Sequence, residues 1–290
     1  MTAPDIVFPA LCKGASRGSA DAQKRFWWTI RGEYFLLFCV AVASGTRDLS
    51  GLGPLLPTLL LIALAGIFGF KVYMKPDRDW YRCRALAESV KTSTWRFSMR
   101  AHPFGDAPSI ERPKAEFRNF LKDILKANQH MAENFQDSDA DQITASMLEV
   151  RELPLEERIE YYVEKRIDDQ RDWYSRKSEA NRNAFRFWTV CTLIAYVLAI
   201  IILNAEQLGL WTVYAFGPLI VVVTSAIGWL QMKRHSELTA SYSLTAHEIG
   251  IISGNSDSVS TEEQFSEFVN ETELAFSREH TQWVARREAN

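Results

Sequence analysis

The chain has 290 residues, with 33 basic side chains against 36 acidic ones and a formal net charge of -3. This balance argues against a globally basic nucleic-acid-binding protein, and the length allows one or two ordinary domains. The mean hydropathy is near neutral because strongly apolar segments and densely charged segments offset each other. The four cysteines form no C-x-x-C pair, so the sequence indicates neither a metal site nor a disulfide framework.

Four apolar stretches approach or reach the roughly 20 residues that a helix needs to cross a bilayer. A soluble protein of this length has too little remaining chain to cover four such helices, so we reject the interpretation as buried core helices. The stretches pair through short loops at 46–53 and 204–209, which predicts two transmembrane hairpins over residues 26–74 and 184–232. The stretches are Phe26–Gly45, Pro54–Met74, Phe187–Leu203 and Leu210–Met232.

The first stretch differs from the others because it contains both Arg31 and Glu33. Two placements of these charges are open. They lie at the lipid headgroups, beside an interfacial belt that includes Trp27 and Trp28, or they face a polar cavity within a helix bundle. We favour the headgroup placement.

Lysine and arginine residues cluster at the open ends of both hairpins, whereas the two short loops contain only Arg47. Because basic segments stay on the cytoplasmic side, both termini and the long middle segment are expected to be cytoplasmic. The first twenty residues contain no apolar core of the kind found in signal peptides, so we expect no cleaved leader.

Outside the hairpins the sequence predicts helices, and the whole chain is therefore expected to be an all-α integral membrane protein with a cytoplasmic helical bundle. Residues 1–25 form an N-terminal segment, residues 75–150 a first helical region and residues 233–290 the C-terminal helices. Residues 151–183 form a juxtamembrane amphipathic helix. This helix is expected to continue into the third apolar stretch, which would make it a lever as well as a packing element.

The two halves share one order of elements, namely hairpin, helix, break and second helix. The second helix of the first half has an apolar stripe from Phe117 to Leu125, and that of the second half has one from Phe265 to Trp283. The string E-F-x-x-F-L that begins at Glu116 matches Q-F-x-x-F-V, which begins at Gln264. This match indicates an internal duplication.

No arrangement of residues indicates catalysis. The sequence contains no P-loop, no H-E-x-x-H motif and no G-x-S-x-G motif. The adjacent pairs His247-Glu248 and Glu279-His280 do not share a helix face. We therefore expect no enzymatic activity, no cofactor and no metal.

The first hairpin is followed by the string DRDWYRCRALAESVKTSTWRFSMRAHPF at residues 77–104. This arrangement resembles the SLATT family, whose two-transmembrane effector domains associate with nucleotidyltransferases and nucleotide-sensing domains in bacterial conflict systems. The strings at 166–182 and 268–283 resemble the family too. The resemblance covers most of the chain, and its A-E-S-x-K-T-x-x-W-R string is specific but not catalytic.

The resemblance implies an anti-phage defence effector that forms a homo-oligomeric pore or ion channel in the bacterial inner membrane, with a tetramer as the first expectation. Its gating would be controlled by a nucleotide-derived ligand made by a partner nucleotidyltransferase. That ligand would be a cyclic oligonucleotide or, in Hailong-type systems, a single-stranded DNA oligomer that holds the effector closed. Opening would arrest growth or kill the cell, as in abortive infection.

The basic and aromatic helix after the first hairpin is the candidate ligand-binding region. Arginines can hold phosphates, and aromatic rings can stack on bases at roughly 1–3 kcal/mol per base. Arg96 and Arg100 are one helical turn apart and are expected to share a face. The alternatives are contact with anionic lipid headgroups and packing of the aromatic rings against the 117–125 helix. The candidate residues are Trp80, Tyr81, Arg82, Arg84, Lys91, Trp95, Arg96 and Arg100.

Thr189, Thr192 and Tyr196 follow one stripe of the third span and are the candidate pore-lining residues. The alternative is that they hydrogen-bond to a neighbouring helix. In the fourth span Gly217 and Gly228 belong to a stripe of small residues, which more often indicates close helix packing than a conduction path.

The competing function is a non-conducting membrane scaffold whose cytoplasmic helices recruit soluble partners. A transporter is disfavoured, because coupled transport needs ionisable residues within the membrane and the apolar cores of the spans after residue 50 contain none. Leakage of a dye from reconstituted vesicles would separate a channel from a scaffold.

Overall fold

The computed structural model describes residues 3–45, 55–105, 107–129, 141–210 and 215–288, with side chains as far as Ser277. Every regular element in these ranges is a helix, as predicted. The α-helices are α1 (Ala10–Gly45), α2 (Leu55–Met74), α3 (Pro76–Ser98), α4 (Glu111–Ala127), α5 (Ala145–Glu152), α6 (Leu155–Tyr162), α7 (Asp169–Gln207), α8 (Phe216–Lys233), α9 (His235–Ser253) and α10 (Glu262–Glu288). A π-helical segment, η2 (Val163–Asp168), joins α6 to α7, and a short 3₁₀ turn, η3 (Ser256–Ser258), precedes α10.

The chain divides into two compact units, each built from separate segments of the sequence. We call residues 1–23, 77–176 and 241–290 the bundle unit, and residues 24–76 and 177–240 the span unit. The two predicted hairpins, residues 26–74 and 184–232, fall within the residues of the span unit.

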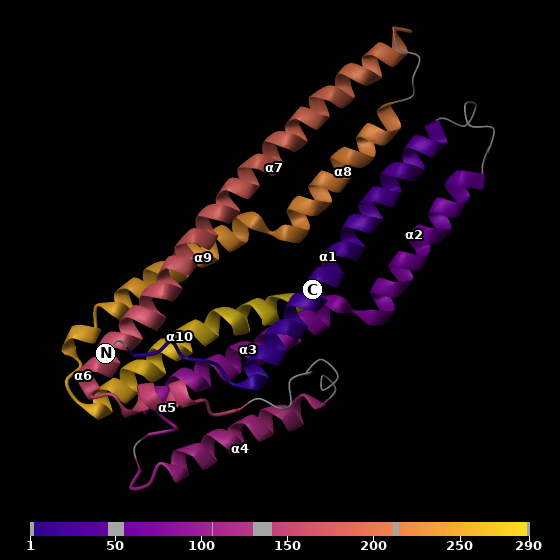
Figure 1. Ribbon diagram of the computed structural model, residues 1–290. Helices are drawn as coiled ribbons and strands as arrows, with labels where there is room; N and C mark the ends of the chain where they lie inside the picture. Colours follow the sequence, from indigo (N-terminus) through magenta and orange to yellow (C-terminus); the bar gives the residue numbers. More distant parts are fainter. Residues whose placement is uncertain (1–2, 46–54, 106, 130–140, 211–214, 289–290) are drawn as a thin grey trace. The chain divides into compact units, whose positions relative to one another are not determined.

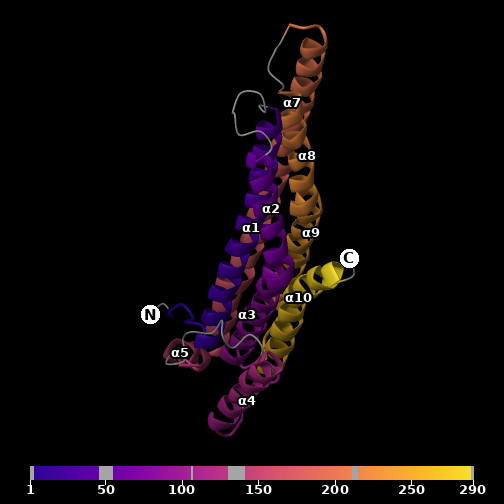
Figure 2. The same cartoon turned by 90° about the vertical axis from the view of Figure 1, so that its right-hand side faces the viewer.

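The span unit takes its helices from α1, α2, α7 and α8, which supply the four helical stretches that are long and apolar enough to cross a membrane. In Figures 1 and 2, α1 runs beside α2 and α7 runs beside α8, so each pair forms a hairpin. The described helix of the fourth span, α8, begins at Phe216, and residues 211–214 of the predicted span lie outside the described residues. α7 continues to Gln207, into the segment predicted as a loop.

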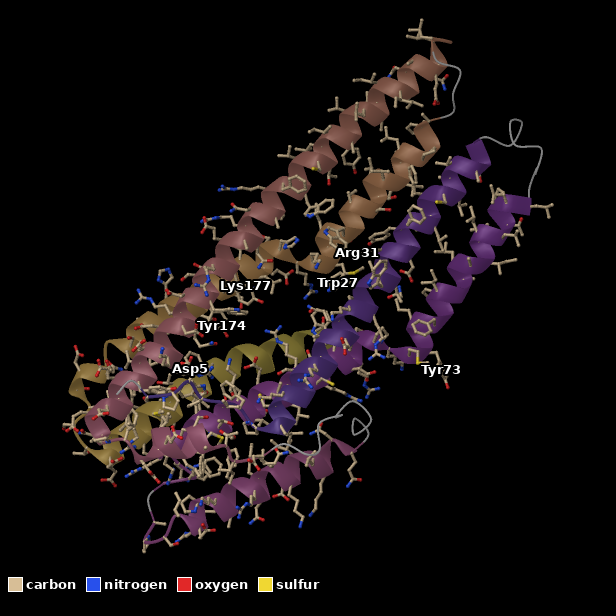
Figure 3. All side chains as sticks on the ribbon, in the orientation of Figure 1. Asp5, Trp27, Arg31, Tyr73, Tyr174 and Lys177 are labelled. Carbon is tan, nitrogen blue, oxygen red and sulfur yellow. The ribbon has the colours of Figure 1, made fainter. Side chains whose placement is uncertain are left out.

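Polar and aromatic contacts join the helices of the span unit. Lys71 Nζ of α2 lies 2.7 Å from Glu33 Oε2 of α1, so the acidic residue of the first stretch has a partner in its own hairpin. The Trp27 ring, labelled with Arg31 in Figure 3, lies 5.3 Å from that of Trp229 on α8. Lys233 Nζ lies 3.5 Å from the centroid of the Trp27 ring. This belt of rings and cations is typical of a membrane interface.

The bundle unit has a first apolar cluster around α3, α4 and the start of α1. The Phe97 and Phe117 ring centroids are 5.0 Å apart, and Phe104 contacts both rings. Phe117 and Leu121 are buried, which confirms the core face predicted for α4. Leu125, predicted on the same stripe, is instead 41% exposed and lies in the last turn of α4, which ends two residues later.

A second cluster collects residues from the end of α3, from α6, η2 and α7, and from α9 and α10. The α10 stripe is confirmed as far as the side chains are described, because Phe265, Val269 and Phe276 are all buried. Trp283, the last member of the predicted stripe, lies outside the described side chains. The stretch from Leu155 to Gln207 is a single helix 53 residues long, as predicted, although its π-helical segment was not.

Buried arginines bind backbone carbonyls at the end of α3 and in the turn that follows it. Arg151 donates to the carbonyl oxygens of Phe97 and Gly105, and Arg158 Nη1 donates to that of Met99 at 3.0 Å. These charge-assisted bonds fix the turn after α3 to α5 and α6.

The two halves share the order of their elements and also the backbone conformation between two consecutive helices. α2 ends one residue before Lys75, whose φ is 44°, and α8 ends one residue before Arg234, whose φ is 48°. A single basic residue in the left-handed region therefore connects the second helix of each hairpin to the helix that follows. This shared detail supports the duplication inferred from the sequence.

Candidate ligand-binding site

The predicted ligand-binding residues do not form one surface. Arg100 lies beyond the end of α3 with a φ of 55°, so it does not continue the helical face of Arg96, contrary to the prediction. Arg100 Nε instead donates to the carbonyl of Arg151 at 2.8 Å. The left-handed backbone at Arg100 ends the helix and turns this side chain towards α5.

Both tryptophans of α3 are buried, with 6% of Trp80 and 4% of Trp95 exposed. Trp80 stacks on Tyr81 at 4.7 Å, and Trp95 lies against the rings of Tyr161 and Tyr162. In the described structure these rings are occupied by protein contacts. The remaining predicted residues, Arg82, Arg84, Lys91 and Arg96, are partly buried.

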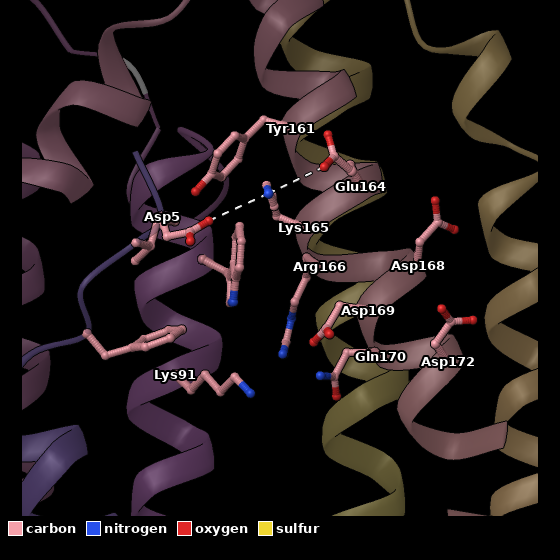
Figure 4. Close-up of a pocket in the computed structure, with 13 residues that line it drawn as sticks. Asp5, Lys91, Tyr161, Glu164, Lys165, Arg166, Asp168, Asp169, Gln170 and Asp172 are labelled. Atoms are coloured by element: carbon pink, nitrogen blue, oxygen red, sulfur yellow. Dashed lines mark ion pairs between the residues drawn. The ribbon is translucent and has the colours of Figure 1, made fainter. Parts of the chain in front are cut away.

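One cavity of about 470 Å³ in the bundle unit brings two of the predicted residues together, Lys91 and Trp95. The other walls come from the N-terminal segment before α1, from α6 and η2, and from the start of α7 (Figure 4). The volume lies within the range of about 300–1,000 Å³ typical of small-molecule sites. The lining residues are Asp5, Ile6, Phe8, Lys91, Trp95, Tyr161, Glu164, Lys165, Arg166, Asp168, Asp169, Gln170 and Asp172.

The π-helical segment supplies Glu164, Lys165, Arg166 and Asp168 to this cavity. π-helical turns are rare within α-helices and are found frequently at functional sites, because their wider turn redirects side chains. Here Arg166 is 98% buried while the neighbouring Lys165 remains on the rim, where it pairs with Asp5 at 3.6 Å.

Arg166 is held by a buried ion pair with α10. Its Nε and Nη2 donate to the two carboxylate oxygens of Glu273 at 2.8 and 2.7 Å, and Tyr162 Oη donates to the same carboxylate at 3.0 Å. Burial opposes the charge of Arg166, but the Glu273 carboxylate outweighs burial and raises the pKa of the guanidinium. Arg166 therefore remains a cation although its side chain is buried.

Lys91 projects from α3 into the same cavity, and Figure 4 shows its ammonium group and the Arg166 guanidinium directed at the same space. Burial, and then the positive charge of Arg166, lower the pKa of Lys91. Its Nζ lies 5.8 Å from the centroid of the Phe8 ring. Two like charges thus converge in a partly desolvated space, an arrangement that favours an anion between them.

Sequence reasoning missed Arg166 and Glu273, which organise this cavity. Arg166 lies in a densely charged segment where a solvated side chain was the simplest interpretation. Glu273 did give a signal, because it follows Val269 by four residues and so falls on the buried face of α10. A carboxylate at a core position indicates a buried cationic partner.

The candidate pore-lining residues differ in burial. Thr192 is 7% exposed and its Oγ1 donates to the Trp188 carbonyl of the same helix at 2.8 Å. Thr189 is partly buried, whereas Tyr196 is 42% exposed. The buried face of this part of α7 continues through Ala195 and Ala199 instead of Tyr196.

Two family models match the chain, one to each half. The model for SMODS and SLOG-associating 2TM effector domain 3 matches residues 9–159, more than half of the chain. The chain belongs to the SLATT family. The model for SMODS and SLOG-associating 2TM effector domain 1 matches residues 162–283 of this SLATT protein. Searches of curated proteins and of solved structures found no match.

The two matches meet between residues 159 and 162, close to the start of η2. Each matched region contains one hairpin of the span unit and the helices after it, in keeping with the inferred duplication. The SLATT protein therefore carries two membrane effector domains of the kind found in defence systems, which confirms the family resemblance.

Proposed function

We propose that this SLATT protein is a non-enzymatic, homo-oligomeric pore of the bacterial inner membrane, with a tetramer as the first expectation. Its opening is controlled by a nucleotide-derived ligand made by a partner nucleotidyltransferase, and its role is anti-phage defence. The family supports the effector role, and the four apolar helices support the membrane location.

The observation that carries the control by a ligand is the cavity on the continuous helix from Leu155 to Gln207. The early part of this helix, from Tyr161 to Asp172, lines the cavity, and its later part is the third apolar stretch of the span unit. A ligand that contacts the first part acts on a segment that the membrane helix continues without a break. Differential binding to two arrangements of this helix is the minimum requirement for gating.

Dye release from vesicles tests the proposal. The full chain is reconstituted into vesicles that contain a self-quenched dye, and cyclic oligonucleotides and single-stranded DNA oligomers are added separately. We expect one class to change the leak rate at least tenfold, as an increase if the ligand opens the pore and as a decrease if it closes it. Protein-free vesicles and mononucleotides serve as controls.

An absence of leakage under every condition contradicts the pore. Combined with the recovery of soluble partners on the same vesicles, that result would favour the membrane scaffold. Mass measurement of the detergent-solubilised protein gives the subunit number, and a monomer contradicts the proposed oligomer.

A further inference from the structure

Three nitrogen donors belong to side chains that line the cavity in the bundle unit, and two of them have no hydrogen-bond partner among the described residues. Arg166 uses Nε and Nη2 on Glu273, and its buried Nη1 has no partner among the described residues. The same holds for the buried Nε1 of Trp95, whose ring lies 5.8 Å from the Arg166 guanidinium. Lys91 Nζ is the third donor.

A buried donor without a partner is unfavourable by about 1–3 kcal/mol, and by more when it is charged. Two such atoms beside one cavity are therefore a sign of a missing acceptor. An indole and a guanidinium cannot accept hydrogen bonds, and neither can a charged ammonium. The ligand group that completes this site must supply several acceptors and negative charge together.

The carboxylates of the cavity do not fill this role. Figure 4 shows Asp168 and Asp172 directed away from the space between Lys91 and Arg166. Glu164 and Asp5 pair with Lys165 at 3.3 and 3.6 Å. The side chains of Asp169 and Gln170 also extend towards the cavity, but Arg166 Nη1 has no hydrogen-bond partner among the described residues.

We propose that Lys91 Nζ, Arg166 Nη1 and Trp95 Nε1 form a binding site for one phosphate group, a phosphomonoester or phosphodiester. A phosphate offers several strong acceptor oxygens on one centre and a charge that relieves the repulsion between the two cations. Arg166 of η2 then contacts both Glu273 of α10 and the bound phosphate, and Lys91 of α3 contacts the same phosphate. The three elements are thereby connected at one site. The identity of the ligand as a nucleotide derivative rests on the proposed function, whereas the phosphate chemistry does not.

Inorganic phosphate is the direct probe. The full chain is placed in nanodiscs of phosphatidylcholine and titrated by calorimetry, with chloride at equal ionic strength as the reference. We expect saturable binding of phosphate and an increase in the unfolding temperature. Lys91→Met should weaken binding at least about tenfold, because it removes a charge-assisted hydrogen bond. Trp95→Phe keeps the ring, removes the N–H and should weaken binding several-fold.

Lys165→Met is the matched control, because it removes an equal charge from the rim of the same cavity. It should change phosphate binding less than twofold. Unchanged unfolding temperatures of the phosphate-free variants verify that each one folds. If phosphate stabilises no more than chloride, or if Lys165→Met weakens binding as much as Lys91→Met, the proposed site is wrong.

A second arm identifies the source of the phosphate by replacing part of the phosphatidylcholine with phosphatidylglycerol. Stabilisation by this lipid that Lys91→Met abolishes would assign the site to a lipid headgroup, which supports phosphate recognition and contradicts the proposed nucleotide ligand. Conversely, a leak that responds to oligonucleotides equally in the natural protein and in Lys91→Met supports the proposed function and overturns the assignment of the nucleotide ligand to this site.

Discussion

The bundle unit and the span unit are both helical, but they place their large apolar side chains in opposite directions. In the bundle unit Phe97, Phe117 and Phe265 are fully buried in apolar clusters. In the span unit Leu59 and Ile200 are exposed to 62% and 60%. Helical periodicity determines which residues share a face in both units, whereas the surrounding solvent determines whether an apolar face turns inward or outward.

The two units also differ in how deeply they bury their ion pairs. The bundle unit buries the ion pair of Arg166 and Glu273 within its core, where each partner depends on the other. In the span unit Lys71 and Glu33 pair between α1 and α2, and both remain partly exposed. The ion pair of the bundle unit therefore lies in its core, whereas that of the span unit lies partly exposed between two helices.

The largest expected effect in the bundle unit follows from Glu273→Gln. This change leaves Arg166 buried without a counter-charge and should lower the free energy of unfolding by about 3–5 kcal/mol. Chemical denaturation of the detergent-solubilised protein measures the loss. The double variant Arg166→Met, Glu273→Leu removes both charges and should be more stable than Glu273→Gln alone. An equal or greater loss in the double variant would show that packing, and not charge, dominates this position.

Ile194→Asp tests the outward face of the span unit, because Ile194 is 55% exposed and lies near the centre of the third apolar stretch. An aspartate near the centre of a transmembrane helix disfavours insertion by about 3 kcal/mol relative to isoleucine. We expect a much smaller fraction of the protein to resist alkaline extraction from membranes, while Ile194→Leu behaves like the natural protein. Normal insertion of the aspartate variant would show that this face does not contact lipid.

Gly228→Ala tests the inward face of the same unit. A Cβ atom at Gly228 would lie 2.8 Å from the Tyr34 hydroxyl, too close without a shift of the tyrosine. We expect a loss of about 1–3 kcal/mol in unfolding free energy. Adding Tyr34→Phe should restore stability, because the next atom, Tyr34 Cζ, is 3.6 Å away. A failure of this rescue would place the steric conflict elsewhere.

The smallest expected effect on stability is that of Thr192→Val. The Thr192 hydroxyl bonds within its own helix, so its removal should change the unfolding free energy by less than about 1 kcal/mol. A pore-lining position should nevertheless alter the rate of dye release, because valine removes a polar group from the conduction path. An unchanged leak rate would assign Thr192 to helix packing.

Those elements that depend on residues close together in the chain were predicted correctly from the sequence. The four apolar stretches, the pairing into hairpins and the buried stripes of α4 and α10 all follow from composition and period. Helix ends were less accurate, as the end of α7 illustrates, because this helix continues to Gln207 through residues that were predicted as a loop. The left-handed joints at Lys75 and Arg234 were not predicted, since neither position carries the glycine that usually marks such a backbone.

Only part of the candidate site was predicted, because contacts between residues far apart in the sequence bring its other residues together. Lys91 and Trp95 were found from their residue types on one helix, and the cavity does bring them together. The burial of Arg166 depends on Glu273, which is far away in the sequence, and on a π-helical turn that no local sequence pattern predicts. Long-range pairing of this kind cannot be derived from the periodicity of either helix alone.

The long separation between Arg166 and Glu273 has a consequence for biosynthesis. The ribosome makes the arginine 107 residues before its carboxylate, and both helices of the second hairpin are synthesised in between. At roughly 5–20 residues per second, several seconds pass before the pair can form. Until the C-terminal helix emerges, a nascent chain keeps this cation uncompensated and its bundle open. A message truncated before codon 273 would thus yield an incomplete protein whose buried arginine has no counter-charge, and proteases would be expected to degrade it.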